Sequence, residues 1–238
     1  MLFTSHLIRQ IPLEKRTMLL LLTLAAGSMD SVSYLGLGQV FPAMMTGNIV
    51  FLGLRAGQGD YLAASRGFVA LLGFCLGVIS GAAIVERKPR NAEWPISVTW
   101  ALAVEALLLV IFVLLWFSCG GERVGGLKYT LILISSMAMG IQSAAVGYLG
   151  VPGITTTYIT GTLTALMVAL RHRLSCKKAQ DRASQGVTAP HPDSRPSTSH
   201  MVSLATVVFF YAVGAFIGSV LQENESSIIE SGFPAFAV

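Results

Sequence analysis

Long apolar stretches separated by short polar segments constrain this chain more than any other feature. A helix that crosses a bilayer needs about 20 predominantly apolar residues to cover about 30 Å of hydrocarbon. Five stretches reach that length, at residues 17–38, 61–85, 94–117, 127–150 and 201–221. The composition agrees, because 53% of the residues are hydrophobic and only 12% are charged. The sequence therefore predicts an all-α, polytopic membrane helix bundle and excludes a soluble globular domain.

Two further stretches, residues 40–54 and 153–170, are shorter or more polar. At 1.5 Å per residue, residues 40–54 would form roughly 22 Å of helix. Such a segment either crosses a locally thinned bilayer or enters and leaves on the same side. The sequence therefore predicts five to seven transmembrane segments.

The basic residues indicate the orientation. Lys and Arg outnumber Asp and Glu by 16 to 12, and with either five or seven spans most of them fall on the side of the N-terminus. We therefore expect a cytoplasmic N-terminus and an acidic C-terminal tail outside. A basic excess confined to loops between apolar segments is what membrane orientation requires, so no nucleic-acid partner is expected.

The whole chain, residues 1–238, is expected to form a single membrane domain. Residues 175–200 are rich in Ser, Pro, Thr and Lys, and this composition predicts a mobile cytoplasmic loop. The three cysteines, Cys75, Cys119 and Cys176, are too widely separated for a metal motif or a disulfide framework. No metal and no cofactor are expected.

A repeated order of features divides the chain into two three-segment units, residues 17–85 and 127–221. Residues 94–117 have no counterpart and are expected to form a linker helix. With seven spans the two units would be parallel, and with five they would be inverted. Both arrangements occur in transporters, although a duplication can also serve only to close a bundle.

Three features recur in the same order in the two units. Asp30 lies within the first helix of one unit, and Gln142, 112 positions later, lies within the first helix of the other. The motifs MMTGN (44–48) and YITGT (158–162) follow, with their Thr-Gly pairs 114 positions apart. Each unit then ends in a helix with regularly spaced glycines. These are Gly73, Gly77 and Gly81 in the first unit and Gly214 and Gly218 in the second, and we expect them to pack against other helices.

These motifs resemble a known family. The run GSMDSVSYLGLGQVFPAMMTGN, together with MGIQSAAV and TTTYITGTLT, is similar to the YoaK family of uncharacterised bacterial integral membrane proteins, a domain of unknown function. The resemblance covers roughly residues 17–221. It implies a multi-pass protein of the bacterial inner membrane with no assigned substrate.

Two carboxylates lie within predicted spans, Asp30 in the first and Glu105 in the linker helix. A charge at mid-membrane is costly, about 2.5 to 3.5 kcal/mol for Asp on insertion scales, so each calls for a reason. The functional interpretation is a proton relay or a cation site. The structural alternative is a protonated acid that hydrogen-bonds to a neighbouring helix.

The motif residues Thr46, Asn48, Thr160 and Thr162, with Gln142, complete the candidate substrate or proton path. The segments around Gly47 and Gly161 could unwind and expose backbone groups to a ligand. Alternatively, the glycines allow close helix contact and the hydroxyls bond back into their own helices.

The sequence contains no nucleophile, metal or acid-base set apart from the two carboxylates, so we do not expect an enzyme. The favoured function is a secondary transporter or permease for a small solute in the lipid bilayer, with proton coupling left open. Two alternatives are an accessory protein that binds a partner through its Gly-rich helix faces and an intramembrane enzyme that acts on lipid. Self-association into a homo-oligomer also stays open.

Overall fold

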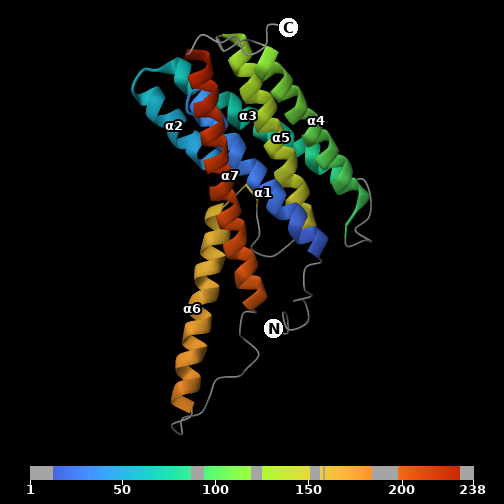
Figure 1. Ribbon diagram of the computed structural model, residues 1–238, viewed down its shortest axis with the longest axis vertical. Coiled ribbons are helices and arrows are strands. Elements are labelled where there is room, and N and C mark those ends of the chain that lie inside the picture. Colours follow the sequence, from blue (N-terminus) through green and yellow to red (C-terminus); the bar gives the residue numbers. More distant parts are fainter. Residues whose placement is uncertain are drawn as a thin grey trace.

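The computed structural model describes residues 13–86, 94–118, 125–150, 156, 157, 159–183 and 198–230. Within these residues the chain forms seven helices and no strand, which confirms the predicted all-α class. The helices are α1 (Leu13–Gly36), α2 (Met45–Gly57), α3 (Tyr61–Val85), α4 (Ile96–Ser118), α5 (Gly126–Leu149), α6 (Ile159–Ala183) and α7 (Thr198–Glu230). Figure 1 shows one bundle, from which α6 projects at the end where α1 begins.

Five of the described helices, α1, α3, α4, α5 and α7, are long and apolar enough to cross a membrane. The 13 residues of α2 form roughly 20 Å of helix at 1.5 Å per residue, which is too short to cross. The second half of α6 carries the basic run RHRLSCKKAQDR, which cannot lie in hydrocarbon. The number of described helices that can cross a membrane thus agrees with the lower limit of the predicted five to seven transmembrane segments.

The outer surface of the bundle is apolar. Ile79 of α3, Trp100 of α4 and Phe216 of α7 are 67%, 63% and 70% exposed. In water such side chains would form a large unfavourable patch, whereas in a bilayer the acyl chains cover them. This surface is that of a multi-pass membrane protein.

The chain turns back directly after α1. Gly38 and Gln39 have φ angles of 89° and 63°, the left-handed region that commonly ends a helix and that glycine adopts without steric penalty. The chain then runs back along α1 until the backbone N–H of Ala43 donates to Oδ1 of Asp30, at 2.7 Å. Asp30 belongs to the interior of α1, so the chain has re-entered the bundle at this point.

α2 returns to the end of α1 that the chain has just left. In the last turn of α2, Arg55 donates to the side chain of Gln39. At the start of α2, Asn48 donates to the carbonyl of Phe41 at 2.6 Å and accepts from the N–H of Phe41 at 2.9 Å. Residues 37–57 are therefore a re-entrant hairpin, and Asn48 joins its two arms.

A similar reversal follows α5. Thr156 and Thr157 lie beside the interior of α5, where Gln142 donates to the hydroxyl of Thr156 at 2.8 Å and Thr157 donates to the hydroxyl of Ser143 at 3.1 Å. α6 begins two residues later, at Ile159, and then extends beyond the bundle. α6 therefore starts inside the bundle, as α2 does.

Two helix pairs hold the bundle together, α3 with α5 and α1 with α7. The predicted packing glycines lie in these pairs: Gly73, Gly77 and Gly81 face α5, and Gly214 and Gly218 face α1. A Cβ at any of them would press on the backbone of the neighbouring helix. Small residues at such contacts let membrane helices approach closely, which is the main source of their attraction in lipid.

The two pairs are built alike. Each contact of the α1–α7 pair has an equivalent in the α3–α5 pair. A residue of α1 corresponds to the residue of α5 that lies 113 positions later, and a residue of α3 corresponds to the residue of α7 that lies 137 positions later. The matched contacts are Gly27 with Tyr211 and Ala215, Gly140 with Phe74 and Val78, Gly214 with Leu24, and Gly77 with Met137. The first and third helices of each unit therefore pack on the third and first helices of the other.

The two units are inverted. The chain crosses in α1, α3 and α4 before it enters α5, so α5 runs opposite to α1 (Figure 1). α4 packs on α5 and to a smaller extent on α3. It is the helix without a counterpart, at the place predicted for the linker.

The segment predicted as a loop, residues 175–200, is partly helical. α6 continues to Ala183 because Lys177, Lys178, Ala179 and Gln180 are all good helix formers, and α7 begins at Thr198. Residues 184–197 lie outside the described part of the chain. The two helices therefore extend into the segment predicted as a loop from both of its ends.

A single cysteine tests the number of spans. Gln58 is exposed in the turn between α2 and α3, so Gln58→Cys spares the buried contacts. With α2 re-entrant, we expect an impermeant thiol reagent to label this cysteine from the outside of intact cells. A cysteine at Glu14, which is exposed in the first turn of α1, should be labelled only after the membrane is opened. Labelling of both positions from the same side would contradict five spans.

Candidate functional site

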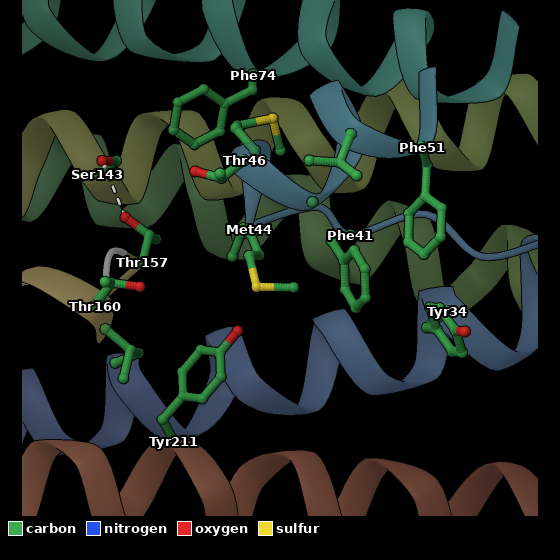
Figure 2. A pocket seen from close by; sticks show the side chains of 15 residues that line it. Tyr34, Phe41, Met44, Thr46, Phe51, Phe74, Ser143, Thr157, Thr160 and Tyr211 are labelled. Carbon is green, nitrogen blue, oxygen red and sulfur yellow. Dashed lines mark hydrogen bonds between the residues drawn. The ribbon is translucent and has the colours of Figure 1, made fainter. Parts of the chain in front are cut away.

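A cavity of about 650 Å³ lies where the two reversals meet. Figure 2 shows its wall, to which α1, the hairpin, α3, α5, the start of α6 and α7 all contribute. The lining residues are Tyr34, Phe41, Ala43, Met44, Met45, Thr46, Gly47, Val50, Phe51, Phe74, Ser143, Thr157, Ile159, Thr160 and Tyr211. A volume of this size lies within the range of about 300 to 1,000 Å³ typical of small-molecule sites.

Asp30 lies behind this wall, 4% exposed. Its Oδ1 accepts the N–H of Ala43 at 2.7 Å, and its Oδ2 accepts the hydroxyl of Tyr211. The carboxyl therefore lies beside the N-terminal end of α2, where the helix dipole favours a negative charge. Among the described residues, no Lys, Arg or His forms an ion pair with Asp30.

Tyr211 connects this carboxyl to the cavity. Its ring rises from α7 towards α1, and it lines the cavity while its hydroxyl bonds to Asp30 (Figure 2). Tyr211 was not among the site residues predicted from the sequence. The repeat could have indicated it, because Tyr211 precedes Gly214 as Phe74 precedes Gly77, and both aromatic residues line the cavity.

The spacing of the helix contacts corrects the predicted pairing of Asp30 with Gln142. At 113 positions, the counterpart of Asp30 is Ser143. The hydrogen bonds agree, because Asp30 bonds to Ala43 and Ser143 bonds to Thr157, 114 positions after Ala43. The predicted pairing was displaced by one residue because it matched the two mid-span polar residues, Asp30 and Gln142. One half of the site thus carries an acid where the other carries a hydroxyl.

Gln142 is fully buried but is not part of the cavity wall. Its Nε2 donates to Thr156 and to the carbonyl of Leu22, at 2.8 and 3.0 Å. Its Oε1 has no hydrogen-bond partner among the described residues. Gln142 therefore joins α5 to α1 and to the start of the second reversal.

The threonine motifs divide into two kinds of position. Thr46 and Thr160 lie in the first turns of α2 and α6 and line the cavity from its two sides (Figure 2). Asn48 and Thr162, two residues further along each helix, are fully buried behind the wall. Asn48 holds the hairpin together, so of these four motif residues only Thr46 and Thr160 can touch a ligand in this arrangement.

Glu105 lies apart from this site. It is 3% exposed on α4, and α4 contributes none of the described lining residues. Its Oε2 has no hydrogen-bond partner among the described residues. The structure therefore does not bring together the two carboxylates that the sequence singled out.

The wall beside the hairpin is aromatic. The rings of Tyr34 and Phe41 stack with centroids 5.0 Å apart, and those of Phe41 and Phe51 stack at 6.1 Å. Position 147, the counterpart of Tyr34 in the other unit, is a glycine. The aromatic wall therefore belongs to one half of the site only.

These features define a class of protein: a polytopic membrane protein in which two inverted units border a cavity at the tips of two partial crossings. A family model described as "Protein of unknown function (DUF1275)" matches residues 18–237, and the chain belongs to this family. The chain is 38% identical to the UPF0700 transmembrane protein YoaK of Bacillus subtilis (strain 168) over 210 residues, which cover 88% of this chain and 85% of that protein. The resemblance drawn from the Asp30, TGN and TGT motifs is thereby confirmed. No solved structure matches the chain.

Proposed function

We propose that this protein is a secondary transporter or permease for a small solute, without enzymatic activity. The observation that carries the proposal is the cavity at the junction of the two inverted units. Transporters built from inverted repeats bind their solutes at such junctions, where interrupted helices expose polar groups inside the membrane. Here α2 and α6 both begin at the cavity and each contributes one threonine to it.

The cavity supports transport over a purely structural duplication. A duplication that only closed a bundle would fill this junction with side chains, as the α3–α5 and α1–α7 contacts are filled. The junction instead retains a volume of about 650 Å³ with six hydroxyl-bearing residues in its wall. They are Tyr34, Thr46, Ser143, Thr157, Thr160 and Tyr211.

The orientation belongs to the same proposal. With five spans, a cytoplasmic N-terminus places the basic half of α6 in the cytoplasm and the end of α7 outside. The protein would lie in the inner membrane of a bacterium. Rocking of one unit against the other would then open the cavity to each side in turn.

Access from both sides of the membrane tests this proposal without knowledge of the solute. In a cysteine-free background, Thr46→Cys and Thr160→Cys place a thiol in each half of the cavity wall. We expect an impermeant thiol reagent to label both variants in right-side-out vesicles and also in inside-out vesicles, because a transporter exposes its site alternately.

Two matched variants control this measurement. Gln58→Cys should be labelled from one side only, and Ile79→Cys, which faces lipid, should resist labelling from both. Labelling of the Thr46 and Thr160 positions from a single side, or from neither, would contradict alternating access and favour the accessory-protein alternative.

A further inference from the structure

The wall of the cavity restricts the chemistry of its ligand. Most of its surface comes from aromatic rings, the thioethers of Met44 and Met45, and aliphatic side chains. None of the described lining residues is Asp, Glu, Lys, Arg or His. A strongly hydrated solute, such as a metal ion that needs six or more oxygen ligands, would lose its hydration shell on entering this cavity. The few hydroxyls of the wall would not compensate for that loss of hydration free energy.

One charged group nevertheless acts on the cavity. Asp30 is a single hydrogen bond away from it, through the hydroxyl of Tyr211. The carboxylate accepts hydrogen bonds from the hydroxyl of Tyr211 and from the backbone N–H groups of Ala43 and Met44. All of these donors are uncharged, so none of them supplies a full positive charge. Within the described residues, no cationic side chain neutralises Asp30.

We propose that the cavity binds a lipophilic organic cation of single charge, for which Asp30 is the counter-charge. This inference rests on the proposed transport function and names its substrate class. A buried carboxylate requires a proton or a cation, and the geometry places an empty apolar volume next to this one. The cation replaces the missing positive partner when it enters.

The aromatic wall suits such a cation. Organic cations are weakly hydrated, and ring faces attract them through the quadrupole of the π system when the charge lies within about 6 Å of the ring centroid. Thioethers add polarizable contacts that adapt to ligands of different shape. The cavity therefore combines a counter-charge, rings and soft sulfur atoms, which together favour soft cations over inorganic ones.

Two ions of nearly the same shape and opposite charge test the proposal. Tetraphenylphosphonium and tetraphenylborate are added to the purified full-length protein in uncharged detergent, and saturable binding above that of empty micelles is measured by equilibrium dialysis. We expect the phosphonium ion to bind at one site per chain and the borate ion not to bind. Asp30→Asn should weaken phosphonium binding by roughly 30-fold, as expected when one partner of a buried charge pair is truncated.

Matched variants separate charge from damage to the fold. Glu105→Gln removes the other buried carboxylate and should leave phosphonium binding unchanged. Thr160→Lys places a positive charge in the wall and should abolish binding, whereas Thr160→Met, of similar length, should reduce it far less. This second pair keeps the test decisive if Asp30→Asn does not fold.

Three outcomes would overturn the proposal. Equal binding of uncharged triphenylphosphine oxide, with no effect of Asp30→Asn, would show a site for neutral solutes. Binding of tetraphenylborate would show that the positive ends of the helix dipoles at Met45 and Ile159 make the cavity prefer an anion. Phosphonium binding that survives Thr160→Lys would place the ion elsewhere. None of these outcomes would change the labelling of the Thr46 position from both sides of the membrane. The binding experiment can therefore rule out a cationic substrate without ruling out transport.

Discussion

Replacement of Asp30 by asparagine is expected to reduce transport strongly while leaving the protein folded in the membrane. Asparagine has the same shape, and its oxygen can accept the N–H of Ala43 while its NH₂ group donates to the Tyr211 hydroxyl. The negative charge is lost, and the Tyr211 hydroxyl accepts a hydrogen bond at this place instead of donating one. Initial rates of solute uptake into proteoliposomes should fall by roughly 30-fold or more, because truncation of one partner of a buried charge pair costs about 2 kcal/mol or more.

Glu105→Gln provides the control for this measurement. It removes an equally buried carboxylate from α4, which supplies none of the described lining residues, and uptake should stay at the wild-type rate. The abundance and elution profile of both variants should equal those of the wild type. Undiminished uptake by the Asp30→Asn variant would eliminate Asp30 as the functional carboxylate and make it a structural cap of α2.

Addition of one methyl group to Gly140 is expected to separate the two central helices. A Cβ there would press on the carbonyl of Phe74 and would lie 2.9 Å from the N atom of Val78. Both are backbone atoms that cannot move aside without a shift of α3. We expect Gly140→Ala to destabilise the protein by about 1 to 3 kcal/mol, the usual cost of overpacking, as measured by thermal unfolding in detergent. Gly27→Ala, at the equivalent place between α1 and α7, should behave alike.

Gly147→Ala is the matched control, because it lies in the same helix with no neighbouring atom within 4 Å of its Cβ position. That variant gains the better helix propensity of alanine without a clash, about 0.5 to 1 kcal/mol. If the Gly140 and Gly147 variants unfolded at the same temperature, close packing at Gly140 would not hold the bundle together.

Sequence reasoning succeeded where a single residue carries its own signal. Hydropathy located the five long helices, and the spaced glycines lie at the helix contacts. Asp30 stood out because a charge in hydrocarbon is costly wherever its partners are. Hydropathy, glycine spacing and a charge within an apolar stretch can all be read from the local sequence.

What the sequence missed depends on the path of the chain. Residues 40–54 are apolar in either topology, so hydropathy alone cannot distinguish a thin crossing from a hairpin. The bond between Phe41 and Asn48 that closes the hairpin has no sequence signature. Tyr211 was overlooked because tyrosine is ordinary in membrane helices, and only the packing of α7 on α1 brings its hydroxyl to Asp30.

The unmatched helix α4 has a consequence for how such a chain could arise. One unit, with two full crossings and a partial one, begins and ends on the same side, so a simple tandem duplication would set both copies in the same direction. The extra crossing of α4 reverses the second copy. Before the fusion, the ancestral half would have had to insert in both directions and pair with itself as an antiparallel dimer. In such an ancestor Asp30 and Ser143 would have been the same residue, and the chemical difference between them would have evolved only after the ancestral gene was duplicated.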